Sequence, residues 1–232
     1  GPGGKLQAKR VLRLGKLVVE ERRIERPEPG LIRQALLDRF AREGMAALPE
    51  REALERLRAR VFFLRALEPE SWPDLSDAAL VERRAEWLEP LLEGRADLNV
   101  AGGALAEAVR ALVPWELQRR LEAEAPERFT APTGNSAAID YAAEGGPRVE
   151  VRVQELFGLA THPTVAAGRA PLTVALLSPA RRPVQTTKDL PGFWRGSYAA
   201  VRVEMRGRYP RHPWPEDPLN APPTARAKPR GT

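Results

Sequence analysis

The hydrophobic pattern of this 232-residue chain changes its period at Glu127. Before that residue, apolar side chains recur every three or four positions, which is typical of helices with one buried face. After it, five short segments are separated by glycine and proline, as in sheets with tight connections. The change predicts an α+β fold, with a mostly helical lobe over residues 6–126 and a β-rich lobe over residues 127–218.

The first lobe begins with a segment that does not follow the helical pattern. Residues 11–24 are β-branched and partly alternating, which predicts one or two strands broken at Gly15. Helical spacing follows at 31–43, 49–67, 77–92, 104–113 and 114–125. The second of these segments carries several arginines, which could face nucleic acid. The carboxylates between them favour a solvated helix surface instead. These arginines are Arg51, Arg56, Arg58, Arg60 and Arg65.

The second lobe has its clearest strand pattern at residues 148–153, where apolar and charged side chains alternate. The five expected strands span 128–132, 138–142, 148–155, 172–177 and 184–187. Short strands with frequent turns are typical of a small antiparallel barrel or sandwich. We therefore expect an antiparallel, barrel-like lobe.

A helix over residues 190–206 is expected to pack on this lobe. Asp189 can cap its start, and Pro191 fits the first turn, where a missing N–H costs nothing. Its apolar residues lie three or four positions apart, and Gly207 is expected to end it. Residues 219–232, rich in Pro, Ala and Arg, are expected to be disordered. Residues 1–5 are expected to be the remnant of a cleaved tag.

Positive charge is concentrated at the C-terminal end of the chain. The net charge is +6, and residues 179–232 hold 11 Lys+Arg against 4 Asp+Glu, while the remainder holds 26 against 27. A basic segment attached to a neutral body indicates a polyanionic partner.

The candidate nucleic-acid contacts lie in this basic segment. Arginine and lysine would neutralise phosphates, Gln185 would donate or accept a hydrogen bond, and Trp214 would stack on a base. Structural roles are open alternatives: Arg181 and Arg182 can pair with Asp140 or Asp189, and Trp214 can clamp the tail. The candidates are Arg181, Arg182, Gln185, Lys188, Arg195, Arg202, Arg206, Arg208, Arg211 and Trp214.

Nothing in the sequence indicates a catalytic, metal or membrane site. There is no G-x-x-x-x-G-K-[ST] loop and no Asp-Glu-Ala-His string. The chain has no cysteine, its two histidines lack ligand spacing, and no serine lies in a G-x-S-x-G context. No apolar run approaches the roughly 18 residues of a membrane span. We expect no catalytic residue, metal or membrane partner in this chain, and a cytoplasmic location.

Several uncommon strings resemble one known family. They are DLPGFWRGSY (189–198), RGRYPRHPWPEDP (206–218), VRVQELFG (151–158), LSPARRPVQ (177–185), WPDLSD (72–77), and PTG (132–134) with IDY (139–141). Together they are similar to the C-terminal region of the bacterial DEAH-box ATP-dependent RNA helicases called HrpB.

The resemblance implies a parent helicase whose motor domains, outside this chain, bind ATP and magnesium. It also implies that some early part of the chain belongs to an accessory helical and oligonucleotide-binding-fold region. The chain is then expected to be a non-catalytic region that binds single-stranded RNA or guides it relative to the motor domains, its partners in cis. The alternative is a docking or autoregulatory module that contacts a protein partner or the helicase core. A structural brace for the motor is a third possibility.

Overall fold

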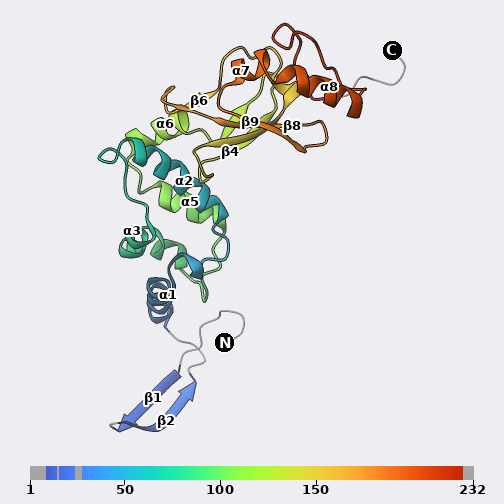
Figure 1. Ribbon diagram of the computed structural model, residues 1–232. Helices are drawn as coiled ribbons and strands as arrows, with labels where there is room; N and C mark the ends of the chain where they lie inside the picture. Colours follow the sequence, from blue (N-terminus) through green and yellow to red (C-terminus); the bar gives the residue numbers. More distant parts are fainter. Residues whose placement is uncertain (1–8, 15, 24–27, 227–232) are drawn as a thin grey trace. The chain divides into compact units, whose positions relative to one another are not determined.

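The computed structural model describes residues 9–14, 16–23 and 28–226. It divides into two compact units, residues 1–118 and 119–232, which are described separately below (Figure 1). The boundary falls inside helix α6 (Trp115–Glu124) and not at residue 126, where the hydrophobic period changes. A change of period marks a change of element type, whereas a unit boundary depends on packing. The remnant expected at residues 1–5 lies outside the described residues.

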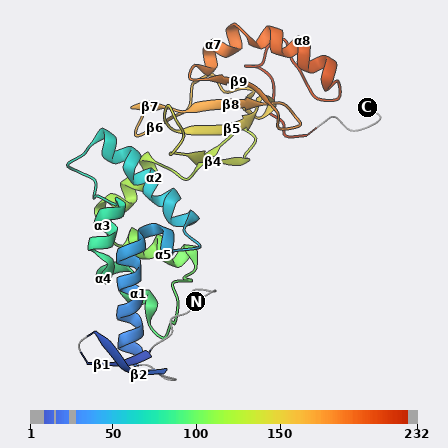
Figure 2. The same cartoon turned by 60° about the horizontal axis from the view of Figure 1, so that its bottom comes forward.

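The first unit consists of a hairpin and a series of helices (Figures 1 and 2). The hairpin pairs β1 (Lys9–Leu14) with β2 (Leu17–Arg23) in antiparallel register, in the segment where strands are expected. The helices that follow, including two short 3-10 turns labelled η, are α1 (Pro29–Glu43), η1 (Gly44–Ala47), α2 (Glu52–Leu67), α3 (Asp77–Glu82), α4 (Arg84–Trp87), η2 (Glu89–Leu92) and α5 (Gly102–Arg110).

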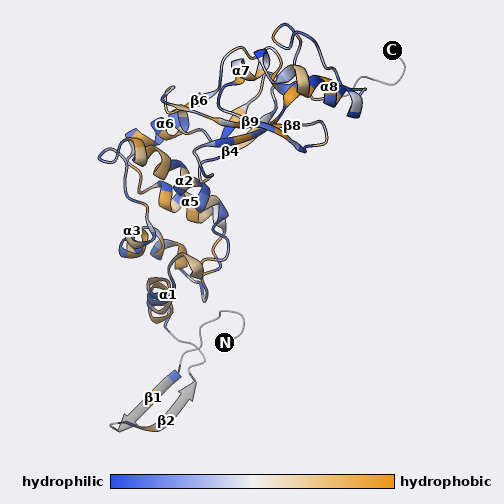
Figure 3. Cartoon of the chain, viewed as in Figure 1, coloured by the Kyte–Doolittle hydropathy of each residue, from blue (hydrophilic) through white to orange (hydrophobic). Residues whose placement is uncertain are grey.

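The helices of the first unit bury one apolar face each. Phe40 of α1 meets Trp87 edge to face, with ring centroids 5.5 Å apart, and the Trp87 Nε1–H donates to Leu80 O at 2.9 Å. Figure 3 shows that polar and apolar residues are mixed along each helix. Among the described residues, no helix has the length and apolar content that crossing a membrane would require.

The second unit contains a five-stranded sheet in the order β3-β4-β5-β8-β9. The five strands coincide closely with the five segments predicted from the sequence. Their bounds are β3 (Arg128–Thr130), β4 (Ser136–Asp140), β5 (Arg148–Arg152), β8 (Thr173–Leu177) and β9 (Pro183–Thr187). The 3-10 turn η3 (Val153–Leu156) and a separate hairpin of β6 (Thr164–Val165) and β7 (Ala170–Pro171) connect β5 to β8.

The expected antiparallel barrel is not present. The sheet is mixed because β5 and β8 run parallel, in register from Arg148↔Thr173 to Arg152↔Leu177. It is also open, with β3 and β9 as its outer strands. A parallel pair needs a long crossover connection, and residues 153–172 supply it. The glycine and proline residues in that connection resemble the short turns of an antiparallel sheet, which is why the sequence pattern is misleading here.

The expected helix over residues 190–206 is two helices, α7 (Leu190–Arg195) and α8 (Tyr198–Arg208), both on the β9 side of the sheet (Figure 2). The Asp189 carboxylate caps α7 by accepting from the Gly192 N–H at 2.9 Å, as expected. The helix breaks at Gly196, and the expected stop, Gly207, lies within α8. Both helices bury aromatic rings, and the Tyr198 and Trp194 rings lie about 6 Å from Phe157 (6.2 and 6.0 Å).

The C-terminal segment, for which the sequence predicts disorder from residue 219, has a defined path over residues 219–226. The Gly158 N–H donates to Pro218 O at 2.9 Å, and the Thr224 N–H donates to Gln154 O at 3.0 Å. These hydrogen bonds hold the segment against the turn that follows β5. Residues 227–232 lie outside the described residues.

Candidate nucleic-acid interface

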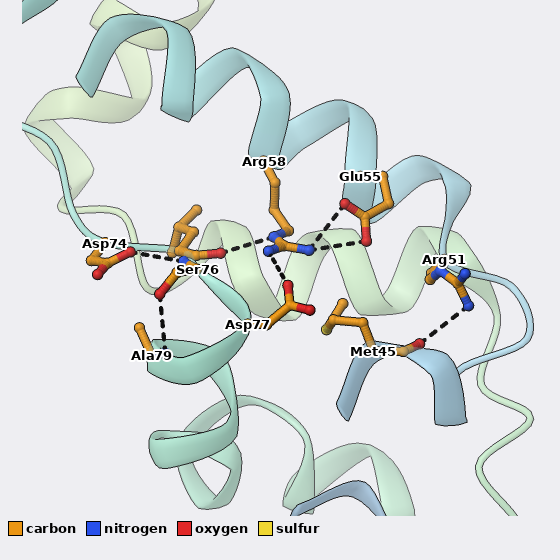
Figure 4. Close-up of polar contacts among 9 residues, drawn as sticks. Met45, Arg51, Glu55, Arg58, Asp74, Ser76, Asp77 and Ala79 are labelled. Carbon is orange, nitrogen blue, oxygen red and sulfur yellow. Dashed lines mark hydrogen bonds and ion pairs between the residues drawn. The ribbon is translucent and has the colours of Figure 1, made fainter. Parts of the chain in front are cut away.

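Arg58 of α2 and Arg51, just before this helix, bind groups within the first unit (Figure 4). Arg58 is 5% exposed, although its pattern in the sequence favours a solvated position. Its Nε–H donates to Leu75 O at 2.8 Å, and its Nη1 donates to both carboxylate oxygens of Glu55 at 3.0 Å. Its Nη2 donates to the Asp77 carboxylate. Arg58 therefore ties α2 to the turn before α3.

The other arginines in and just before α2 also have partners within the first unit. Arg51 donates to Met45 O and Leu48 O, both at 3.2 Å. Arg65 donates to the carbonyls of Pro69 and Trp72, and Arg60 is buried. Arg56 is exposed, and it pairs with Glu52 at 2.5 Å. Arg58 and Arg60 are buried, so the expectation of a solvated surface is wrong for these two, whereas Arg51 and Arg56 are exposed as that expectation requires.

The turn between β8 and β9 presents Arg181 and Arg182 to solvent. Arg181 has φ +58°, in the left-handed region, and its N–H donates to Ser178 O at 2.9 Å. The Arg182 N–H donates to Ser178 Oγ at 3.1 Å, and its carbonyl accepts from the Ser178 N–H. The pairs with Asp140 and Asp189 considered from the sequence are not among the ion pairs of the described residues. Both guanidinium groups are available to a ligand.

Four other candidates have intramolecular partners. The Lys188 Nζ donates to Gly145 O at 2.7 Å, and Gln185 Oε1 accepts from the Ser197 hydroxyl at 2.8 Å. Arg202 donates to Trp214 O at 3.0 Å and pairs with Glu216 at 2.7 Å. Arg208 pairs with Glu204 one helical turn earlier. Lys188, Gln185 and Arg202 therefore connect different segments of the second unit, whereas the Arg208 pair lies within one exposed helix face.

Trp214 is 6% exposed, and its Nε1–H donates to Tyr209 O at 3.1 Å. A ring covered to this extent has no free face on which a base could stack. The structure favours the alternative, in which Trp214 fixes the segment after α8 to the second unit.

Three further candidates, Arg195, Arg206 and Arg211, are exposed and form no ion pair with any described residue. The Tyr209 hydroxyl lies 3.5 Å from Ser178 Oγ, so the segment after α8 runs beside the β8–β9 turn. Burial lowers the pKa of His212, and the positive charges of Arg152 and Arg211 lower it further. Arg152 and Arg211 therefore both lie close to His212, in the segment that runs beside the β8–β9 turn.

A cavity of about 710 Å³ lies where β4 separates from β5. These two strands pair only at Ile139↔Val149 and Asp140↔Arg148, while residues 136–138 of β4 pair with β3 instead. We call this opening the strand fork. Its lining residues are Arg128, Phe129, Ala131, Asn135, Ser136, Ala137, Ala138, Glu150, Val151, Arg152, Glu155, Leu177 and Arg181.

A hydrogen-bonded network fixes one side of the strand fork. Glu155 is 7% exposed and accepts from Arg152 Nε at 2.6 Å, from Asn135 Nδ2 at 2.8 Å and from the Thr133 hydroxyl at 3.2 Å. Burial alone would raise the pKa of Glu155, but these hydrogen bonds and the charge of Arg152 together lower it. The carboxylate is thus ionised, and it holds the Arg152 guanidinium in one orientation.

The sequence pattern indicated Arg181 but not the other residues of the strand fork. Arg128 and Arg152 lie outside the basic C-terminal segment, and on β5 Arg152 belongs to an alternating charged face that is usually solvated. No local signal shows that β4 leaves β5. Among the described residues, no group of three or more His, Asp or Glu side chains could hold a metal ion.

Comparison with known proteins identifies the family. The family model described as "ATP-dependent helicase C-terminal" (HrpB_C) matches residues 87–218. The chain belongs to the HrpB family. It is 41% identical over 227 residues to the ATP-dependent RNA helicase HrpB of Escherichia coli strain K12, which covers 97% of this chain and 28% of that protein.

Two solved structures of Escherichia coli HrpB are similar to the chain. One, described as a DExH-box NTPase, has a TM-score of 0.79 and 40% identity, covering 93% of this chain and 27% of that one. The other, described as a DEAH/RHA helicase, has a TM-score of 0.68 and 37% identity, covering 89% and 26%. The chain therefore corresponds to the C-terminal part of an HrpB helicase, as the resemblance indicated. The family match includes both the strand fork and the β8–β9 turn.

Proposed function

We propose that this chain is the non-catalytic accessory region of an ATP-dependent DEAH-box RNA helicase, and that it binds single-stranded RNA or guides it relative to the motor domains. The observation that carries the proposal is a set of exposed arginines on the second unit that have no carboxylate partner among the described residues. They are Arg181, Arg182, Arg195, Arg206 and Arg211. The related Escherichia coli protein is named as an RNA helicase, which makes RNA the natural polyanion.

The proposed mechanism is electrostatic. Guanidinium groups bind phosphates in a bidentate manner and displace condensed counterions, so affinity falls steeply as salt rises. Phosphate contacts position a strand without reading its bases. ATP hydrolysis with magnesium would belong to the motor domains, which act in cis and lie outside this chain. The accessory region would then keep hold of the strand while the motor moves it.

A docking or autoregulatory role, in contact with a protein partner or the helicase core, is the second candidate. Val203 of α8 is 71% exposed, but a single exposed apolar side chain is common on protein surfaces and does not favour this role. If the chain docked a protein and not RNA, it would not bind RNA at low salt.

A salt titration with a fluorescently labelled single-stranded RNA tests the proposal. We expect log Kobs to fall with log salt with a slope of several units, about one for each phosphate contact. Changing Arg181 and Arg182 together to glutamate is expected to weaken binding roughly tenfold or more and to lower the slope by about two.

The matched control changes Arg42 and Arg56 together to glutamate. These exposed arginines of the first unit give the same change in net charge. We expect the control to alter affinity less than about threefold, because only long-range screened charge is affected. Absence of RNA binding by the unmodified chain at low salt, or an equal loss in the control, would contradict the proposal.

A further inference from the structure

The strand fork leaves two backbone edges of the sheet unpaired. No ladder pairing joins residues 136–138 of β4 with residues 150–152 of β5 in the described structure, although each set pairs with a strand on its other side. Backbone N–H and C=O groups that face a gap in a sheet need partners from solvent or a ligand. The cavity volume of about 710 Å³ lies within the range of roughly 300–1,000 Å³ that small-molecule sites occupy.

Arg152 is held as a preformed phosphate-binding group. Its Nε–H is bound to Glu155, which is itself fixed by Asn135 and Thr133. Within the described structure Nη1 and Nη2 of Arg152 have no partner. When the Nε–H of a guanidinium group is already bound, its Nη1 and Nη2 groups have a fixed orientation. Their N–H groups can then bind two oxygens of one phosphate.

Two more guanidinium groups line the same cavity. Arg181 comes from the β8–β9 turn, and no described residue pairs with its side chain. Arg128 donates from Nε and Nη2 to the hydroxyl and carbonyl of Ser136, at 2.8 and 2.7 Å, so its Nη1 group remains available. The acidic residues of the cavity are already engaged: Glu155 as above, and Glu150 with Arg148 at 3.2 Å. The remaining hydrogen-bonding capacity is therefore mostly cationic.

Phe129 gives the strand fork its only aromatic lining residue among those described, and it is half-buried on β3. A base can stack on such a ring, and the backbone edges and the Asn135 amide offer donors and acceptors beside it. An extended peptide would fit the unpaired edges too. The cluster of three guanidinium groups favours a ligand that carries a phosphate.

We propose that the strand fork binds one nucleotide of a single strand, with its phosphate on Arg152 and Arg181 and its base against Phe129. This inference rests on the proposed RNA-binding function and adds a discrete site to a surface that otherwise binds only phosphates. Glu155 is a positioning residue, since it acts through Arg152.

Crosslinking locates the site without relying on affinity. A single-stranded RNA of about twelve nucleotides, carrying 4-thiouridine, is irradiated with the full chain, and the crosslinked peptides are identified by mass spectrometry. We expect crosslinks within residues 128–138 and 150–155. Crosslinks confined to α7, α8 or the first unit would overturn the proposal while leaving RNA binding intact. Failure of the unmodified chain to bind RNA would instead contradict the proposed function.

Two single variants separate a site from a general charge effect. Arg152→Gln is expected to weaken RNA binding roughly tenfold and to lower the salt slope by about one. Arg119→Gln removes the same charge from an exposed position in α6 outside the cavity lining, and it is expected to change affinity less than about threefold. Arg152→Lys should restore only part of the affinity, because an ammonium group cannot bind two oxygens in a fixed fork. Equal losses for Arg152→Gln and Arg119→Gln would overturn the site.

Two possible results, a variant that does not fold and a site that binds a free nucleotide, each need an additional experiment. If Arg152→Gln fails to fold, as thermal unfolding would show, Arg181→Gln replaces it, because that exposed side chain has no ion pair with a described residue. Free UMP is titrated in parallel with the RNA. Saturable binding of UMP that Arg152→Gln abolishes, without strand crosslinks at the strand fork, would show a site for a free nucleotide and overturn the strand assignment.

Discussion

At the scale of single residues, two arginines show how context sets the role of one side chain. Arg58 is buried and has all three of its guanidinium nitrogens bound within the protein. Arg152 has only its Nε bound, to a carboxylate that is itself held in place. The first arrangement leaves nothing for a ligand, whereas the second leaves two nitrogens with a fixed orientation. Both residues lie in charged segments that look alike in the sequence.

Arg58→Ala is expected to lower the free energy of unfolding of the first unit by roughly 2–4 kcal/mol. The change removes three sets of hydrogen bonds and leaves the Leu75 carbonyl without its partner. Urea unfolding followed by tryptophan fluorescence measures the effect. Arg56→Ala is the matched control on the same helix. Its exposed pair with Glu52 should contribute less than about 0.5 kcal/mol. Equal effects of the two changes would contradict the buried role of Arg58.

The network around Glu155 predicts a pH dependence of stability. The pKa of Glu155 is lowered in the folded chain, so below its ordinary value of 4.5 the unfolded chain binds more protons than the folded one. The stabilisation by this group is therefore complete above pH 4.5 and is lost as the pH falls through the folded value. Melting temperatures measured from about pH 6 to about pH 3 should fall less steeply for Glu155→Gln than for the unmodified chain. Identical slopes would contradict this assignment.

At the scale of elements, the glycines of α7 and α8 differ in the room that surrounds them. A Cβ at Gly192 would lie 2.1 Å from Asp189 Oδ2, and one at Gly196 would lie 3.1 Å from Gly192 O. A side chain at residue 192 would therefore displace the capping carboxylate, whereas one at residue 196 would need only a small shift of the backbone. Beyond its own helix backbone, a Cβ at Gly207 would meet no atom within 4 Å, so no packing contact at this position requires glycine.

Gly192→Ala should displace the Asp189 carboxylate and remove its hydrogen bond to the residue 192 N–H. We expect the free energy of unfolding of the second unit to fall by roughly 0.5–1 kcal/mol, the typical value of a helix cap. Gly207→Ala, in α8, is the opposite case. It should raise stability by up to roughly 1 kcal/mol because alanine favours the helix. Urea titrations of both variants measure the difference, and stabilisation by Gly192→Ala would contradict the role of the cap.

At the scale of the whole molecule, the excess positive charge of residues 179–232 lies within the second unit. Of the ten candidate residues, five arginines stay exposed without a carboxylate partner among the described residues, and the others bind a carbonyl, a carboxylate or a hydroxyl group or lie in the core. Arg128 and Arg152, from strands far from the C-terminal segment, line the strand fork together with Arg181. The membership of this surface is thus a property of the folded unit.

The sequence by itself determined the element types, because apolar spacing follows directly from the geometry of helices and strands. The five strands, the Asp189 cap and the family could all be predicted from residues 72–218. Only the tertiary structure decided that β5 pairs parallel with β8, that β4 leaves β5 to open a cavity, and that Arg58 is buried. Those features depend on contacts between residues distant in the chain, and local spacing carries no information about such contacts.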